Sequence, residues 1–154
     1  MKPSRHGRPP ALAELKFAAE ASALLGKSHQ EIFTFINETN LWGAAESRSG
    51  LGSELGATAH LRTELPKLFR ILKIKSIVDI PCGDFGWLGK TDLPVETYIG
   101  ADIVEAIIHN LQGIYQGSRT GTEYRFCVLD LTQGNLPKVD MVLCRDCLVH
   151  FSYK

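Results

Sequence analysis

The sequence lacks an excess of charge of either sign, a long hydrophobic run and a secretion signal, and each absence excludes a class of protein. Seventeen Lys and Arg residues balance seventeen Asp and Glu residues, so no overall charge would recruit a nucleic acid or an anionic membrane. No window approaches the roughly 18 apolar residues that a membrane-spanning helix requires. Glu14, Lys16 and Glu20 interrupt any signal-peptide core after the basic, proline-rich residues 1–10. We therefore expect a cytoplasmic protein that binds neither nucleic acid nor membrane.

Cysteine is scarce as well, with four in the chain, and without a secretion signal these are expected to be reduced thiols. Cys144 and Cys147 form a C-x-x-C pair, which with Cys82 and His150 offers four potential metal ligands. Zinc accepts such a set, but zinc-binding pairs usually lie in a turn, whereas this pair follows a predicted strand and enters a predicted helix. Thioredoxin-like redox pairs follow the first strand of a different pattern. We expect buried thiols and no metal.

What is present is the composition of a globular domain, with 44% hydrophobic and 22% charged residues. A helix is predicted over residues 11–25, ended by Gly26, and a second begins after Ser28, whose hydroxyl and Glu31 form a capping-box pattern. We divide the chain into a flexible tail (1–10), a helical segment with a Gly/Ser-rich loop (11–57) and a ligand-binding domain (58–154).

The pattern then changes to short apolar strands, after a third predicted helix in which Pro66 should force a break or a fresh start. Four β-branched runs each end at or near an aspartate, namely IKSIVDIP, TYIGADIV, YRFCVLDL and VDMVLCRDCLV. Nearly continuous apolar strands are typical of a parallel sheet that is covered on both faces. Between the second and third strands, a predicted helix places Ile107, Ile108, Leu111 and Ile114 on one face. The fold class is therefore α/β, a Rossmann-like doubly wound parallel sheet of about four strands preceded by N-terminal helices.

The ligand crevice of such a sheet lies at the carboxyl ends of the strands, where this sequence concentrates aspartates. A dinucleotide requires a G-x-G-x-x-G turn, in which backbone N–H groups approach the pyrophosphate. Here Pro81 replaces the first glycine and Asp84 adds negative charge within the turn. Both changes disfavour phosphate, and with it a nicotinamide-dependent oxidoreductase.

The same carboxylates favour a ligand with a positive centre, a ribose and an adenine, and S-adenosylmethionine has all three. Its ammonium group would meet Asp79 or Asp84. Asp102, nineteen residues after Gly83, has the position of the ribose-binding acid in nucleotide-binding folds. Asp130 or the neighbouring backbone would accept a hydrogen bond from the adenine amino group. We therefore predict S-adenosylmethionine as the cofactor.

The series VDIPCGDFGW, YIGADIV, FCVLDLT and VDMVLCRDCLVHF resembles the motif series of class I S-adenosylmethionine-dependent methyltransferases. The upstream run WGAAESRSGLGSELGATAHLRTELP is similar to the segment before the fold in a bacterial branch with a D-x-P-C-G-D-F turn. The resemblance covers roughly residues 41–154. The family fold has seven strands, so it implies that this chain holds an incomplete sheet that stops after the fourth. The predicted cofactor-binding residues are Asp79, Pro81, Cys82, Gly83, Asp84, Asp102, Ile103, Asp130, Leu131 and Arg145.

Asp146 and His150 are the predicted catalytic residues, because a methyl acceptor must lose a proton as it attacks. If a helix begins here, the two share a face; a helix-capping aspartate and a half-buried histidine are the alternative. The loop 47–53 is either a lid, with Arg48 facing the cofactor's carboxylate, or a connection, and Trp87 is interpreted as a core residue.

The resemblance implies a methyltransferase that acts on a small molecule, for which a sugar hydroxyl is one guess. The alternative is a non-catalytic module that binds the cofactor or acts through another chain. Its motivation is the fourth strand, whose unpaired apolar edge would favour a homo-oligomer.

Overall fold

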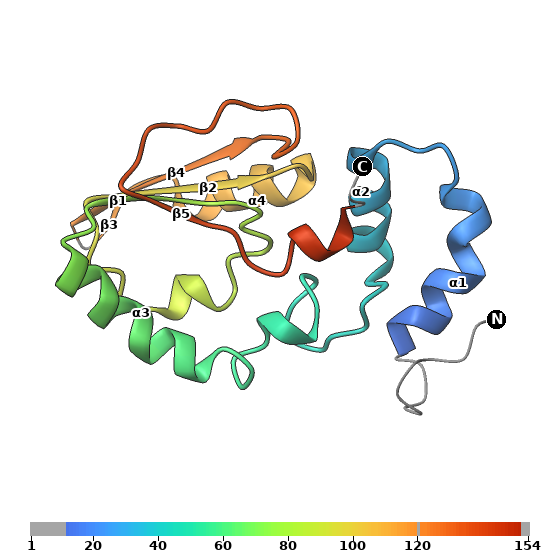
Figure 1. Ribbon diagram of the computed structural model, residues 1–154, viewed down its shortest axis with the longest axis horizontal. Helices are drawn as coiled ribbons and strands as arrows, with labels where there is room; N and C mark the ends of the chain where they lie inside the picture. The colour runs from blue at the N-terminus through green and yellow to red at the C-terminus, as the bar shows by residue number, and fades with distance from the viewer. Residues whose placement is uncertain (1–11, 120, 152–154) are drawn as a thin grey trace.

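The computed structural model describes residues 12–119 and 121–151 (Figure 1). It contains four α-helices in this part of the chain, which are α1 (Leu12–Leu24), α2 (His29–Thr39), α3 (Ala59–Leu72) and α4 (Glu105–Tyr115). The strands are β1 (Ser76–Asp79), β2 (Thr97–Asp102), β3 (Gly117–Arg119), β4 (Thr122–Val128) and β5 (Met141–Leu143). Three short 3₁₀ turns, η1 (Leu51–Ser53), η2 (Leu88–Lys90) and η3 (Leu148–His150), complete the described elements. The tail predicted for residues 1–10 lies outside the described residues.

The strands form one sheet in the order β3-β4-β2-β1-β5. The strands β4, β2, β1 and β5 are parallel, with Ile77 of β1 opposite Tyr98 of β2 and opposite Met141 of β5. The chain builds outward from β1 through β2 to β4 on one side and then returns to place β5 on the other. This reversal puts the topological switch point between β1 and β5. The predicted Rossmann-like α/β sheet is confirmed.

The main core lies between one face of the sheet and the helices α3 and α4. Phe69 of α3, Tyr98 of β2 and Ile108 of α4 are fully buried there, and Phe126 of β4 joins them. Phe85, from the turn after β1, packs its ring against those of Tyr98 and Phe126, with centroids 4.8 Å and 5.5 Å away. The turn that follows β1 is therefore fixed to the core by its own aromatic side chain.

The second face of the sheet has a smaller core. Val78, Ile80 and Ala101 are fully buried there, and the chain after β4 packs over them through Leu129 and Leu131. This covering chain leads from the end of β4 to β5. It therefore holds residues 129–131 close to the carboxyl edge of the sheet.

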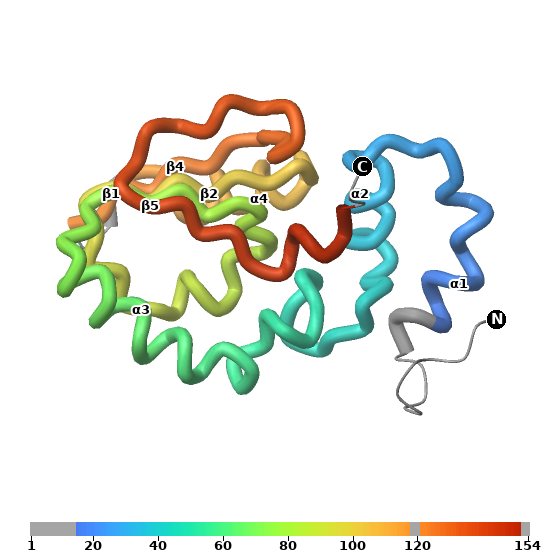
Figure 2. The backbone as a smooth tube through the Cα atoms, in the orientation of Figure 1, coloured from blue at the N-terminus to red at the C-terminus, as the bar shows by residue number. Residues whose placement is uncertain are grey.

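The N-terminal helices follow the sequence pattern closely. Glu31 N–H donates to the Ser28 hydroxyl at 3.3 Å and Ser28 N–H donates to the Glu31 carboxylate at 2.8 Å, so the predicted capping box is confirmed. Gly26, with φ +76°, follows α1 as predicted. Figure 2 shows the chain running from α1 to α2, which lies near the end of the sheet, and then below the sheet in this view to α3.

One prediction about a helix is wrong. Pro66 does not break the third helix, because α3 runs through it and buries Pro66 on the same side as Phe69. Packing of that face outweighs the intrahelical hydrogen bond that proline cannot donate. Of the four residues predicted on one face of α4, Ile108 and Leu111 are buried and Ile107 packs against the core, whereas Ile114 is 46% exposed. It lies in the last turn, at the margin of the core.

Among the described residues, no helix has both the length and the apolar character needed to cross a membrane.

Candidate functional site

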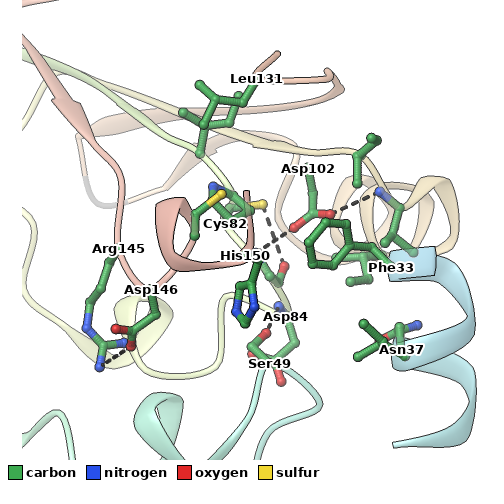
Figure 3. Close-up of a pocket in the computed structure, with 18 of the residues that line it drawn as sticks. Phe33, Asn37, Ser49, Cys82, Asp84, Asp102, Leu131, Arg145, Asp146 and His150 are labelled. Carbon is green, nitrogen blue, oxygen red and sulfur yellow. Dashed lines mark hydrogen bonds and ion pairs between the residues drawn. The ribbon is translucent and has the colours of Figure 1, made fainter. Parts of the chain in front are cut away.

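A hollow of about 1030 Å³, counting the part that is open to solvent, lies at the carboxyl edge of the sheet. One side of the hollow is formed by residues 79–84, 102–104, 129–131 and 145–147, which follow β1, β2, β4 and β5. The other side comes from α2, from Trp42 and from η3 (Figure 3). Every residue predicted for the site from the sequence lines this hollow.

Asp79 ends β1 with its carboxylate almost fully buried, 4% exposed. The Tyr98 hydroxyl donates to it at 2.8 Å, which is its one hydrogen bond to the described residues. The pKa of Asp79 is raised to about 7, mainly by burial; the Tyr98 hydrogen bond opposes this rise, the nearby Asp102 adds to it, and Arg145 opposes it. The site therefore holds a carboxylate that is poorly compensated when it is charged.

Asp102 ends β2 and is held by the backbone of the neighbouring turns. Gly83 N–H donates to its Oδ2 at 3.0 Å, and Val104 N–H donates to its Oδ1 at 3.0 Å. Burial raises the pKa of Asp102, and the backbone N–H groups of Val104, Gly83 and Ile103 partly offset that effect. Because a carboxylate has about four acceptor positions, both oxygens remain able to accept from a ligand.

Gly83 allows two chain segments to approach each other at the centre of the turn. Its φ of +54° lies in the left-handed region, and a Cβ built on it would collide with the Ser49 hydroxyl. Pro81, just before it, follows a cis peptide bond from Ile80. Only glycine therefore fits this position without displacing the loop that contains Ser49.

Asp84 ties the turn to the Gly/Ser-rich loop. Arg48 N–H donates to its Oδ2 at 3.1 Å, Gly86 N–H donates to its Oδ1 at 3.0 Å, and Asp84 N–H donates to the Ser49 hydroxyl at 3.2 Å. The loop therefore lies over the turn as one wall of the hollow.

The guanidinium of Arg48, which would face the cofactor's carboxylate if the loop were a lid, donates to the last carbonyls of α2 instead. Its Nη1 lies 2.7 Å from the Asn37 carbonyl oxygen and 3.1 Å from that of Glu38. The C-terminal end of a helix carries a partial negative charge, so a cation at this position is favourable. Arg48 thus joins α2 to the loop over the turn.

Asp130 and Leu131 lie at the edge of the hollow after β4. Thr132 donates both its N–H and its hydroxyl to Asp130 Oδ1, at 2.8 Å and 2.7 Å. These hydrogen bonds lower the pKa of Asp130. Leu131 comes from above the hollow in Figure 3, and Ile103 lines it from the end of β2. The two apolar side chains offer surface for a flat group.

Arg145 and Asp146 follow β5 and form an ion pair of 3.0 Å. Arg145 also donates to the Gly52 carbonyl oxygen at 2.8 Å and lies 5.7 Å above the ring of Trp87. Trp87 is 7% exposed, packs in the main core, as predicted, and also lines the hollow. The guanidinium is therefore held by three partners.

The condition under which Asp146 and His150 would share a helix face is not met. Asp146 has a left-handed backbone, with φ +53°, and the helical turn η3 begins only at Leu148. The His150 ring instead stacks on Trp42 at 5.5 Å and meets the edge of Phe33 at 6.0 Å. Both predicted catalytic residues line the hollow, but each is positioned by different neighbours.

Sequence reasoning missed the residues that the N-terminal segment contributes to the site. These are His29, Phe33, Ile36, Asn37 and Trp42. The signal available in the sequence was the apolar face of α2, which includes Phe33 and Ile36. Periodicity shows that such a face is buried, but it does not show what the face packs against.

All four cysteines are free thiols, as predicted, with Cys82 and Cys147 buried and the other two half-buried. Burial raises the pKa of Cys82 well above its usual range and, together with Cys144, raises the pKa of Cys147 to about 12. These thiols are therefore neutral and poorly nucleophilic. Within residues 12–119 and 121–151, no group of three or more His, Cys, Asp or Glu side chains is arranged to hold a metal ion.

Comparison of the chain with protein-family models, with curated proteins and with solved structures finds no match. The function is therefore inferred from the residues of this site and their geometry.

Proposed function

We propose that this chain binds S-adenosylmethionine at the carboxyl edge of its sheet and acts as a methyltransferase on a small-molecule acceptor. The observation that carries the proposal is the pair of buried carboxylates, Asp79 and Asp102, at the ends of adjacent strands. Burying charge without a partner is costly, so a site of this kind gains most from a ligand that brings positive charge and hydroxyl donors.

The parts of the cofactor correspond to separate parts of the hollow. The ammonium group would pair with Asp79, whose carboxylate accepts one hydrogen bond, from the Tyr98 hydroxyl, among the described residues. The ribose hydroxyls would donate to Asp102, whose position is fixed by two backbone N–H groups. The adenine ring would lie between Ile103 and Leu131, near Asp130. A pyrophosphate would instead be repelled by the carboxylates Asp79, Asp84 and Asp102.

When bound, S-adenosylmethionine supplies a methyl carbon that is activated by a sulfonium centre. The chain's main task is then to hold donor and acceptor in line, since good orientation of the reactants can lower the activation barrier by about 7–11 kcal/mol. Asp146 and His150 lie on the acceptor side, after β5. Either side chain can take the proton that the acceptor loses, which typically contributes about 10²–10⁴-fold.

Calorimetric titration with S-adenosylhomocysteine and with NAD tests the proposal. We expect S-adenosylhomocysteine to bind and NAD to fail. Asp102→Asn should weaken S-adenosylhomocysteine binding by about 10–100-fold, because it removes charge-assisted acceptors for the ribose. Asp92→Asn is the matched control, since Asp92 is 84% exposed and pairs with Arg70 away from the hollow. Melting temperatures of both variants show whether a loss of binding reflects a loss of folding.

Two results would overturn the proposal. Binding of NAD without S-adenosylhomocysteine would indicate an oxidoreductase, and binding of neither would leave the carboxylate pair without its proposed ligand. Equal affinity of the wild-type chain and Asp102→Asn would remove Asp102 from the cofactor site.

The strand β5 favours a second function, a non-catalytic module that binds the cofactor or acts through another chain. This strand is at one edge of the sheet, and its Val142 side chain is 46% exposed. Unpaired apolar edges promote association, including that of two copies of one chain. A module that binds the cofactor would bind S-adenosylhomocysteine but would form none from S-adenosylmethionine with any acceptor.

A further inference from the structure

Five rings form one side of the hollow, opposite the carboxylates, and we call them the aromatic wall. They are His29, Phe33, Trp42, His150 and Phe151. The first three come from α2 and the residues just after it, and the last two come from η3 and its end. The wall therefore joins two segments that are more than a hundred residues apart in the sequence.

The rings hold one another in place. His29 meets Phe151 edge to face at 5.2 Å, and Phe33 meets His150 at 6.0 Å. Trp42 stacks on His150 at 5.5 Å and has Gly50 against its ring on the loop side. His150 is thus fixed in orientation by a face contact and an edge contact, without a hydrogen bond to its ring from the described residues.

The wall nevertheless keeps surface for a ligand. Phe33, Trp42 and Phe151 are half-buried and His150 is exposed, although all four line the hollow. In Figure 3 the His150 ring lies in the middle of the view, between Phe33 on one side and Asp146 on the other. A flat molecule placed beside His150 would therefore contact aromatic surface on its Phe33 side.

The charges around the wall disfavour an anionic acceptor. The two arginines that line the hollow are already engaged, Arg48 with the carbonyl oxygens of α2 and Arg145 with Asp146 and the Gly52 carbonyl oxygen. The carboxylates Asp79 and Asp102 across the hollow would repel a negative group. An acceptor with a phosphate or carboxylate would have to displace an existing partner of Arg48 or Arg145 before it could pair with either arginine.

The same surroundings favour an aromatic ring over a sugar. A sugar exposes several hydroxyls, each of which needs a hydrogen-bond partner when it is buried. Among the described residues of the hollow, Asn37 is the one side-chain amide, and Ile36 and Ile107 line the hollow together with the rings. An aromatic compound with one or two hydroxyls needs few partners and gains from stacking.

We infer that the methyl acceptor is a neutral aromatic compound with a hydroxyl group, bound against the aromatic wall; this rests on the proposed function. Its ring lies beside Phe33 and its hydroxyl faces His150. The hydroxyl oxygen bonds to the cofactor's methyl carbon as the carbon–sulfur bond breaks and its electron pair passes to sulfur. His150 takes the hydroxyl proton. The products are the aryl methyl ether and S-adenosylhomocysteine.

The test compares three acceptors that differ in one property each, with formation of S-adenosylhomocysteine as the readout. Catechol is neutral and aromatic, 3,4-dihydroxybenzoate adds a negative charge, and methyl β-D-glucopyranoside is neutral without an aromatic ring. We expect turnover with catechol, at least about tenfold less with 3,4-dihydroxybenzoate, and none with the glucoside.

Phe33→Ala and Phe33→Leu test the wall itself. Loss of the aromatic contact should lower kcat/KM for catechol by about tenfold in both variants while the affinity for S-adenosylhomocysteine stays within about twofold. Phe33→Leu keeps an apolar side chain of similar reach, so it retains the fold if Phe33→Ala does not. Phe35→Ala is the control, because Phe35 lies on the same helix but lines the groove between α2 and α4.

Three outcomes would refute this inference while leaving the cofactor site intact. In each of them S-adenosylhomocysteine still binds. The first is turnover of the glucoside or of 3,4-dihydroxybenzoate in preference to catechol, and the second is turnover of none of the three acceptors. The third is unchanged catechol kinetics in Phe33→Leu. Failure of S-adenosylhomocysteine to bind would instead refute the proposed function on which the inference rests.

Discussion

The buried carboxylate of Asp79 makes cofactor binding dependent on pH. Its pKa is about 7 in the free protein, so near neutrality about half of the molecules carry a proton there. Binding of an ammonium group favours the charged carboxylate, and the bound state therefore releases that proton. The affinity for S-adenosylhomocysteine should rise as the pH rises through 7 and level off above about 8.

The size of this effect follows from the fraction of charged Asp79. With a pKa of about 7, the dissociation constant is multiplied by about 11 at pH 6 and by about 1.1 at pH 8, a difference of roughly tenfold. The other groups that face Asp79 are Tyr98, Asp102, Cys82 and Arg145. Tyr98 and Cys82 stay neutral in this range, because burial raises the pKa of each well above its ordinary value.

Asp79→Asn separates this effect from any other titration, because asparagine keeps the shape and an acceptor for Tyr98. Titration of the wild-type chain and of the variant with S-adenosylhomocysteine at pH 6, 7 and 8 should show the tenfold change in the wild type alone. The variant should bind more weakly at pH 8. A variant that keeps the full pH dependence would show that the proton resides elsewhere and would refute the pairing of Asp79 with the ammonium group.

Asp79 should also make the stability of the chain depend on pH, with the opposite sign. The free energy of unfolding should fall as the pH rises, whereas the affinity for S-adenosylhomocysteine rises. The pKa of Asp79 is raised in the folded state to about 7 from an ordinary value of 3.8, so the folded chain holds the proton more tightly. Its contribution to the free energy of unfolding is present at low pH and is lost as the pH rises from about 4 to 7. Between pH 5 and pH 8 that loss is about 2–3 kcal/mol. Urea unfolding should show this loss in the wild type and a smaller one in Asp79→Asn.

Two further predictions concern the turn and the loop above it. Gly83→Ala should lower the free energy of unfolding by at least about 1 kcal/mol and weaken S-adenosylhomocysteine binding, since φ is +54° and the new Cβ meets Ser49. Gly113→Ala, in α4 with open space around it, should cost nothing in the same denaturation assay. Ser49→Ala removes the acceptor for Asp84 N–H and should cost about 1 kcal/mol. It should also speed amide exchange at Asp84, whereas exposed Ser22→Ala should do neither.

The strands and the shared edge of the sheet could be predicted from the sequence because they depend on local pattern. β-branched runs without alternation indicate a parallel sheet, and parallel strands bring their carboxyl ends to one edge. Asp79, Asp84 and Asp102 therefore had to lie near one another once the strands were recognised. The short strand β3 was missed because GSR contains no apolar residue, and it forms by pairing antiparallel with β4.

The wall contributed by α2 could not be predicted, because docking of a helix depends on tertiary contacts. The sequence shows that Phe33 and Ile36 share an apolar face, but nothing local indicates that η3 packs against it. The left-handed backbone of Asp146 was also hidden, since that residue type gives only a weak preference for φ above zero. The pairing of Asp146 with Arg145 therefore had to be seen in the structure.

The site depends on the N-terminal segment as much as on the sheet. The contacts that join the two include the hydrogen bonds between Asp84 and the loop, the hydrogen bond from Arg145 to Gly52, and the stack of Trp42 on His150. The first closes the hollow over the turn after β1, and the other two close it beside the end of β5. The carboxylates that would bind the cofactor come from the sheet, whereas the surface that would meet an acceptor comes largely from α2. Cofactor affinity and acceptor choice should therefore be separable by substitution, because no one element supplies both.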